Sequence, residues 1–325
     1  MIDLHLHLDG SLTPDQVIAL AKLQGVPLPT EDRTQLEALL SVPTDCQSLN
    51  DYLRCFDLPV SVLQSGEGIS LAVEGLVCRL REQGLLYGEI RFAPQLHCTR
   101  GLTQHQVVEA ALSGLRRGMK KASGISCQLI LCCMRGGEEA ANEETVNTAA
   151  YFLGNGVCAL DLAGAEALYP VELYRSLFSR AVSLQVPFTI HAGEAAGPES
   201  VWSALEMGAS RIGHGVRSRE EEDLLVKLAD AKIPLELCPT SNVQTKAVSG
   251  FPDFPLRDYM RRGLVVTLNT DNMTVSGTIL QEEYRRLSIT KEESRVLLRN
   301  SVEAAFLSRK GKEELLRKVE EQEGA

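Results

Sequence analysis

The chain opens with the run Ile2-Asp3-Leu4-His5-Leu6-His7-Leu8, in which two histidines stand two positions apart. Side chains two apart on a strand project to the same face. Seven further short apolar runs follow, and an amphipathic segment separates each from the next. Near-continuous apolar runs of this length are typical of strands that are covered on both faces. The predicted strands are residues 2–8, 85–93, 126–134, 157–163, 187–191, 211–214, 233–237 and 264–269.

Helical patterns fill the spaces between these runs, as in 104–121, 171–184, 200–207 and 220–232. Alternation of strands and helices predicts right-handed βαβ units and a parallel sheet. Eight such units in 325 residues favour an α/β fold of the closed (β/α)8, TIM-type barrel kind. No low-complexity linker divides the chain, so we expect residues 1–325 to form one catalytic barrel domain.

The first and second predicted strands are separated by an unusually long helical segment, about residues 14–83. An insertion at this point of a barrel lies over the carboxyl ends of the strands, where active sites form. Its apolar residues Leu49, Tyr52, Leu53 and Phe56 fall at helical spacing. They are predicted either to pack against the barrel or to form a lid. The C-terminal tail, 308–325, predicts a solvated helix with charged pairs at i,i+4 spacing.

Charge and composition exclude several classes of function. Thirty-three basic and 43 acidic residues give a net charge of −10, which disfavours nucleic-acid and anionic-membrane partners. No apolar run approaches the roughly 18–20 residues of a membrane helix. The nine cysteines form no C-x-x-C pair, and MIDLHLHLDGS has neither a basic region nor a cleavage site. We therefore expect a cytoplasmic protein, and no exposed apolar stripe predicts its oligomeric state.

The histidines are the first sign of chemistry. His5 and His7 share a face of the first strand, and His191 ends the fifth strand within His-Ala-Gly-Glu. Neutral imidazole is the commonest metal ligand in proteins, and zinc accepts it readily. A same-face pair of buried imidazoles needs partners that an apolar core does not supply. These three histidines therefore predict a metal site.

Further polar residues follow the ends of later strands. Glu194 comes three residues after His191, where a desolvated carboxyl group beside a metal can transfer protons. His214 ends the sixth strand in Gly213-His214-Gly215, and Asp271 follows the eighth strand. A lone Asp after a strand commonly caps a helix, but joint placement at successive strand ends indicates a shared site.

One metal is predicted rather than two. A second metal would need a lysine or acid at the end of the fourth strand, which reads Asp161-Leu162-Ala163-Gly164, and only Glu166 lies close after it. A metal-dependent amide or ester hydrolase with two metals is therefore less favoured. Of the other polar residues, Arg91 predicts a buried structural ion pair, and His97 and His105 predict ordinary surface positions.

The ordered motifs together resemble the adenosine deaminase family. They occur in order from residue 2 to residue 306, nearly the whole chain. The principal ones are His5-Leu6-His7-Leu8-Asp9-Gly10-Ser11, His191-Ala192-Gly193-Glu194, Gly213-His214-Gly215, Cys238-Pro239-Thr240-Ser241-Asn242 and Asn269-Thr270-Asp271. Secondary matches are Tyr87-Gly88-Glu89-Ile90-Arg91-Phe92-Ala93-Pro94, Asp161-Leu162-Ala163-Gly164 and Asn300-Ser301-Val302-Glu303-Ala304-Ala305-Phe306.

The resemblance implies hydrolytic deamination of adenosine and 2'-deoxyadenosine with one zinc ion per chain. The implied zinc ligands are His5, His7, His191 and Asp271. Glu194 would protonate ring nitrogen 1, and His214 with Asp271 would orient the attacking hydroxide and take up its proton. Gly164 would offer a backbone amide to ring nitrogen 3, Asp9 would bind the ribose 5'-hydroxyl, and His7 also belongs to the implied substrate-binding set.

One position departs from the commonest pattern of the family. Many members have a second aspartate after Asn-Thr-Asp that bonds ring nitrogen 7, whereas this chain has Asn272. An amide can donate to nitrogen 7 directly, so the implied contact is preserved. The departure leaves adenine, or another 6-aminopurine, as the alternative substrate. AMP is disfavoured because Asp9 would repel a phosphate.

Overall fold

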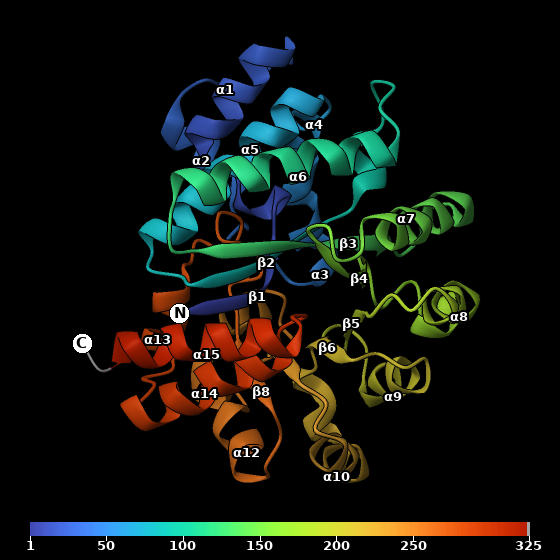
Figure 1. The fold of residues 1–325 in the computed structure, drawn as a ribbon, viewed down its shortest axis with the longest axis vertical. Coiled ribbons are helices and arrows are strands. Elements are labelled where there is room, and N and C mark those ends of the chain that lie inside the picture. The colour runs from blue at the N-terminus through green and yellow to red at the C-terminus, as the bar shows by residue number, and fades with distance from the viewer. Residues whose placement is uncertain (324–325) are drawn as a thin grey trace.

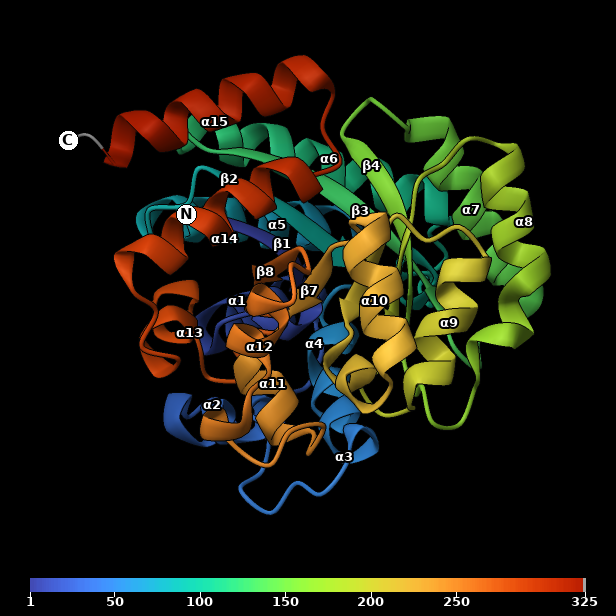
Figure 2. The same ribbon diagram turned by 90° about the horizontal axis from the view of Figure 1, so that it is seen from below.

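A computed structural model describes residues 1–323, and its centre is a barrel of eight parallel strands (Figures 1 and 2). Adjacent strands pair in the orders β1-β2-β3-β4 and β5-β6-β7-β8. Single parallel bridges, Leu6 to Asp271 and Leu160 to Phe188, join the two halves, so the sheet closes on itself. The predicted α/β barrel is confirmed. The strands are β1 (Ile2–His7), β2 (Tyr87–Phe92), β3 (Ser126–Met134), β4 (Val157–Ala163), β5 (Thr189–Ala192), β6 (Arg211–His214), β7 (Leu235–Leu237) and β8 (Val266–Leu268).

Helices surround the strands, as expected for apolar strands that are covered on their outer face (Figure 2). The helix predicted over 104–121 has those bounds, and the pattern over 171–184 splits into a 3-10 turn and α8. After β2 the helices are η3 (Pro94–His97), α6 (Gln104–Lys121), α7 (Glu139–Phe152), η4 (Val171–Tyr174), α8 (Arg175–Ser183), α9 (Pro198–Glu206), η5 (Val216–Glu220), α10 (Glu222–Ala231), α11 (Pro239–Gln244), η6 (Phe251–Asp253), α12 (Leu256–Arg261), α13 (Leu280–Arg286), α14 (Lys291–Ala304) and α15 (Arg309–Glu323).

The long segment between β1 and β2 is mostly helical. It contains η1 (Asp9–Ser11), α1 (Pro14–Gln24), α2 (Arg33–Leu40), α3 (Leu49–Leu53), η2 (Arg54–Phe56), α4 (Asp57–Ser61) and α5 (Gly66–Glu82). Figure 1 shows α5 running beside α6 on the outside of the barrel. The short elements α3, η2 and α4 instead contribute side chains to the wall of the central cavity. Serine side chains cap two helices of this segment: Ser48 and Ser65 accept backbone hydrogen bonds at the starts of α3 and α5.

The prediction that the C-terminal tail is only a solvated helix is wrong. The tail forms α15 and carries the expected i,i+4 pair between Arg309 and Glu313, 3.0 Å apart. However, Leu315 and Val319 are buried in a cluster with Ile2 and Leu4 of β1. These two apolar residues are themselves four apart, so one stripe of the charged helix packs against the start of the barrel. Residues 324–325 of the predicted tail lie outside the described residues.

His97 also corrects a prediction. It is fully buried at the end of η3, and its ring centroid lies 5.7 Å from that of Phe92. A single turn after β2 folds this histidine back toward the strand, which the polar loop around it did not indicate. His105 is partly exposed and lies 3.6 Å from Glu109, as expected for a surface residue.

Candidate metal centre and active site

The predicted site residues come together at the carboxyl ends of the strands, around a cavity of about 720 Å³. β1 ends at His7, β5 carries His191, β6 ends at His214 and Asp271 follows β8. The lining of the cavity includes His7, Asp9, Gly164, His191, Glu194, His214, Asp271 and Asn272. His5 lies two residues before His7 on β1, deeper in the barrel, and is fully buried.

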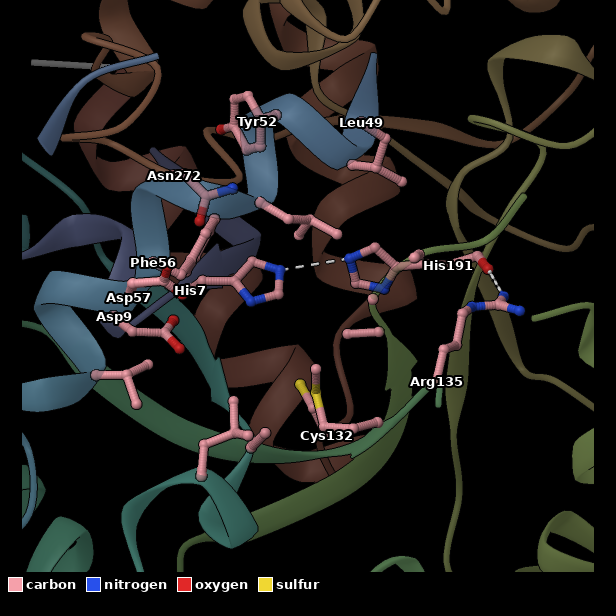
Figure 3. A pocket seen from close by; sticks show the side chains of 18 of the residues that line it. His7, Asp9, Leu49, Tyr52, Phe56, Asp57, Cys132, Arg135, His191 and Asn272 are labelled. Atoms are coloured by element: carbon pink, nitrogen blue, oxygen red, sulfur yellow. Dashed lines mark hydrogen bonds between the residues drawn. The ribbon is translucent and has the colours of Figure 1, made fainter. Parts of the chain in front are cut away.

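The four predicted metal ligands converge on one point. Nε2 of His7 lies 3.3 Å from Nε2 of His191. Oδ1 of Asp271 lies 3.5 Å from Nε2 of His5 and 3.4 Å from Nε2 of His7. One ligand atom from each of the four residues lies within 4.8 Å of all the others. Figure 3 shows His7 and His191 directing ring nitrogens toward one another across the cavity.

Carboxylates hold the opposite nitrogens of two of these rings. Nδ1 of His5 lies 2.8 Å from Oε2 of Glu236, and Nδ1 of His191 lies 2.9 Å from Oδ2 of Asp161. Because a carboxylate only accepts hydrogen bonds, each Nδ1 carries a hydrogen, and in the neutral ring Nε2 then keeps its lone pair. The carboxylates thereby fix the tautomer in which Nε2 faces the point of convergence. Burial opposes the charged form of His191, but Asp161 outweighs burial and raises the pKa of that ring.

Two buried arginines hold these carboxylates in turn. Arg91 donates to Asp161 and to Glu236, in each case at 2.9 Å, so the predicted structural ion pair is confirmed. Arg211 donates to Glu236 at 2.6 Å and lies 2.7 Å from Glu89. All five residues are almost wholly buried. Such outer partners orient metal ligands and raise the cost of moving them.

The donor set fits a divalent metal ion. Among the described residues, Nε2 of His5 is buried without a hydrogen-bond partner. Burial, helped by the charge of Arg91, lowers the pKa of His5 to about 4, and burial lowers the pKa of His7 well below its usual value. Burial opposes ionisation of Asp271, but the neighbouring His5 holds its pKa well below the usual range. Neutral imidazole nitrogens and a carboxylate oxygen repel one another unless a cation lies between them, and they are the ligands zinc prefers.

The backbone at two of these positions adopts an uncommon conformation. His214 and Asp271 both have a φ of +61°, a left-handed region that residues other than glycine rarely occupy. Such positions cost about 1–3 kcal/mol each and persist where surrounding contacts enforce them. Asp271 is enforced by β1, because its N–H donates to the carbonyl of His5 at 2.8 Å and its carbonyl accepts from His7 at 2.7 Å. The contacts that close the barrel therefore also aim the carboxylate.

Glu194 and His214 form an acid–imidazole pair beside the converging ligands. Oε2 of Glu194 lies 3.5 Å from Nε2 of His214, and the Thr245 hydroxyl donates to Oε1 of Glu194 at 3.0 Å. Nδ2 of Asn242 donates to the same oxygen at 3.3 Å and lies 3.0 Å from Nδ1 of His214. Nδ1 of His214 is therefore an acceptor, and Nε2 carries the hydrogen of the neutral ring. Burial raises the pKa of Glu194, which favours its protonated form.

The remaining predicted contacts line the same cavity. Asp9 is buried, and burial raises its pKa to about 6. Gly164 has a φ of +107°, which presents its backbone to the cavity without a side chain. Asn272 is buried, and its Oδ1 lies so close to Gly10 that a Cβ there would be 1.8 Å away. Glycine at position 10 is thus required for Asn272 to occupy its place.

Residues of the long insertion form the outer wall of the cavity. Leu49, Tyr52, Leu53 and Phe56 all line it, and Figure 3 shows Tyr52 and Phe56 on the same side as Asn272. Tyr52 is buried, and its hydroxyl lies 2.6 Å from Oγ of Ser276, in the loop after β8. The structure therefore favours a cavity-facing role over simple packing on the barrel for this segment.

Comparison with known proteins agrees with this geometry. A family model described as adenosine deaminase matches residues 1–322. The chain belongs to the adenosine deaminase family. It is 52% identical to the adenosine deaminase of Haemophilus ducreyi, over 99% of this chain and 96% of that protein.

Solved structures of the family's relatives share the fold. The crystal structure of an adenine deaminase from Arthrobacter aurescens superposes with a TM-score of 0.90 at 28% identity, and covers 100% of this chain and 99% of that one. An N6-methyl-AMP deaminase from Arabidopsis thaliana gives a TM-score of 0.83 at 25% identity, over 97% and 94% of the two chains.

Several residues around the site were not identified from the sequence as contributors to it. Glu236 lies in the middle of β7, a three-residue strand, where a lone acid in an apolar run carries no motif. Asn242 lies within a quoted family motif but had no predicted role. Glu166, considered as a metal-bridging acid, lies apart from the ligand cluster and accepts hydrogen bonds from backbone amides. Within residues 1–323 no helix has the length and apolar character needed to cross a membrane.

Proposed function

We propose that this chain deaminates adenosine and 2'-deoxyadenosine to inosine and 2'-deoxyinosine, releasing ammonia, with one zinc ion bound per chain. The observation that carries the proposal is the convergence of three imidazole nitrogens and the Asp271 carboxylate beside a buried, protonatable Glu194. The 52% identical relative named adenosine deaminase supports the same reaction.

Each group of the proposed reaction comes from a residue already described. His5, His7, His191 and Asp271 hold the zinc ion, which, when bound, lowers the pKa of water and so supplies a nucleophile near neutral pH. Glu194 donates a proton to ring nitrogen 1 and so makes carbon 6 electrophilic. His214 orients the attacking oxygen through its Nε2–H, because Asn242 occupies Nδ1. The Asp271 carboxylate lies beside His214, and together the two would take up the proton of the attacking oxygen and pass it to the amino group, which leaves as ammonia.

Contacts to the rest of the nucleoside set its orientation. The Gly164 amide donates to ring nitrogen 3, and Asn272 donates to ring nitrogen 7. The Asp9 carboxylate accepts from the ribose 5'-hydroxyl, and His7 lies beside the base as well as holding zinc. The Gly10 amide donates to Oδ1 of Asp9 at 3.1 Å. A further donor, the ribose hydroxyl, would satisfy this buried carboxylate better, so a ligand that carries the hydroxyl is favoured over free adenine. The same carboxylate disfavours a 5'-phosphate.

We further propose that residues 1–325 act as one catalytic domain, with the insertion at about 14–83 as its lid. The contact between Tyr52 and Ser276 supports this, because it joins the insertion to the loop that carries Asn272. The net charge of −10 supports a free purine nucleoside as the partner, rather than nucleic acid or a membrane, and cytoplasmic action.

The first experiment follows the ultraviolet change when zinc-loaded protein is added separately to adenosine, adenine and AMP. We expect rapid conversion of adenosine to inosine with an equal amount of ammonia, and little turnover of the other two. Faster turnover of adenine would make adenine the preferred substrate and leave the proposed mechanism unchanged. Zinc content below about one ion per chain, with no activity restored by zinc, would contradict the ligand assignment.

A matched pair of variants tests the proton donor. Glu194→Gln removes the transferable proton and should keep one zinc per chain while kcat falls by about 10²–10⁴-fold. Glu199→Gln makes the same change five residues away, at an exposed carboxylate that accepts from the Gly197 amide, and should turn over normally. Near-normal turnover in Glu194→Gln would exclude Glu194 as the donor.

A further inference from the structure

Glu166 is the most heavily hydrogen-bonded buried carboxylate outside the metal centre. It lies in the loop after β4, two residues beyond Gly164, and is 1% exposed. Its Oε1 accepts from the Gly193 amide at 2.7 Å and the Ser200 hydroxyl at 2.6 Å. Its Oε2 accepts from the amides of residues 194, 195 and 196 at 3.1, 2.6 and 2.9 Å. Five donors thus surround one anion.

Four of these donors are consecutive backbone amides of the turn that carries Glu194. This turn leaves β5 after Ala192 and reaches α9 at Pro198, with no regular element of its own. The Glu194 side chain is held by Thr245 and Asn242, but its backbone is held by Glu166. The Glu166 carboxylate therefore fixes the backbone position of Glu194, and the side chains of Thr245 and Asn242 fix the direction of the Glu194 carboxyl group.

The same residue joins two loops that meet the substrate in the proposed function. Gly164 and Glu166 are on one loop, and Glu194 is on the next. A neighbouring arginine strengthens the connection. Arg135, directly after β3, donates to the carbonyl of His191 (Figure 3) and also to that of Tyr169. The distance between the Gly164 amide and the Glu194 carboxyl is thus set by buried bonds rather than by the flexible turn alone.

We propose that Glu166 is a positioning residue for the reaction: it holds the 193–196 turn so that Glu194 meets ring nitrogen 1 while the base is bound at Gly164. This inference rests on the proposed function. A purely structural alternative exists, because Glu166 also bonds Ser200 in the first turn of α9. The experiment must therefore separate action through Glu194 from general support of the helix.

A double-mutant cycle makes this separation. Glu166→Gln replaces one acceptor oxygen by an NH2 group that faces backbone donors, whichever way the amide turns. Displacement of a reacting group by about 1 Å costs up to about 10²-fold, so we expect kcat to fall about 10- to 100-fold with one zinc retained. If Glu166 acts through Glu194, the Glu166→Gln/Glu194→Gln double variant should be no slower than Glu194→Gln, within about twofold.

The matched control is Glu172→Gln. Glu172 belongs to η4, after the same loop, and its carboxylate also bonds α9, through Ser203. Within residues 1–323, the four turn amides donate to Glu166 and not to Glu172. This variant should keep wild-type kcat. Losses that add in the double variant, or an equal loss in Glu172→Gln, would overturn the positioning role and leave support of α9 as the explanation. If Glu166→Gln does not fold, the cycle is run with Glu166→Asp, which keeps the carboxylate but shortens the side chain by one methylene group, and additive losses there overturn the proposal.

Hydrogen exchange provides a readout that does not depend on turnover. In Glu166→Gln, the amides of residues 193–196 should exchange at least about tenfold faster, while those of β5 keep their protection. Unchanged exchange in the turn would overturn the proposal even in an active enzyme. An inactive wild-type protein, by contrast, would refute the proposed function and leave the exchange result to decide whether Glu166 anchors the turn.

Discussion

Glu236→Gln is the most informative single change in the buried network beneath the metal centre. The Glu236 carboxylate is completely buried and accepts from three side chains. Oε1 accepts from Nε of Arg211 at 2.6 Å, and Oε2 accepts from Nη2 of Arg91 at 2.9 Å and Nδ1 of His5 at 2.8 Å. The substitution keeps the shape of the side chain but replaces one acceptor oxygen by a donor.

The size of the effect follows from which oxygen is replaced. If the NH2 group takes the place of Oε2, the hydrogens of His5 and Arg91 both lose their acceptor; if it takes the place of Oε1, only Arg211 does. The second orientation costs less, but it still leaves one buried, charged donor facing another donor. An unsatisfied charged group of this kind costs about 2–3 kcal/mol, and a broken buried ion pair about 3–5 kcal/mol. Since each arginine keeps a second carboxylate, we expect a loss of about 2–4 kcal/mol.

Urea denaturation of the zinc-loaded protein, with zinc content measured on the same samples, tests this expectation. Glu74→Gln is the control, because Glu74 also pairs with two basic side chains, Arg117 and Lys121, which are 46% and 67% exposed. Its loss should not exceed about 1 kcal/mol. Zinc affinity of Glu236→Gln should fall about 10- to 100-fold, because a neutral amide oxygen raises the basicity of the His5 ring less than the carboxylate does. A change in the free energy of unfolding below about 1 kcal/mol, with normal zinc affinity, would refute the assignment of Glu236 as a support of the centre.

Three further predictions concern the substrate side. Thr245→Val removes a donor that stabilises ionised Glu194, so the pKa of Glu194 rises and the alkaline fall of kcat/KM should move up by about 0.5–1 pH unit; a shift to lower pH would contradict the proton-donor role. Asn272→Asp should lower kcat/KM for adenosine about tenfold at pH 8 and by less as the pH falls, since only the protonated acid can donate to nitrogen 7, and 7-deazaadenosine should show no such pH dependence. Gly10→Ala places a Cβ 1.8 Å from Oδ1 of Asn272 and should raise KM about tenfold. An unchanged KM would show that Asn272 does not contact the base.

The sequence was most informative where strands end. Ser126–Met134, Val157–Ala163 and Arg211–His214 have the predicted bounds, because continuous apolar runs bounded by polar residues mark buried strands clearly. His5, His7, His191 and Asp271 were predicted together for a related reason: barrel closure brings the carboxyl ends of parallel strands to one rim.

The supporting residues could not be predicted in the same way. Glu236 meets His5 across 231 residues of sequence, and Glu166 meets the 193–196 turn only because two loops pack at a particular depth. Such contacts depend on strand register, which apolar patterning does not specify for strands that are buried on both faces. The burial of His97 was missed for a similar reason, since one turn of 3-10 helix reverses its direction.

The buried charges give a physical reason for the choice of a divalent cation. The Arg91 and Arg211 guanidinium groups contact three carboxylates beneath the centre, and a fourth carboxylate, that of Asp271, lies among the ligands. The pKa values of His5 and His7 are lowered and that of Glu194 is raised. The charged groups are Arg91, Arg211, Glu89, Asp161, Glu236 and Asp271. Among these six groups the acids outnumber the bases by two, and a divalent cation at the ligands would offset that excess, since isolated buried charge is expensive. The outer network therefore does more than orient imidazoles. Without the metal ion it leaves an excess of buried negative charge, so chelation should lower the free energy of unfolding as well as abolish turnover.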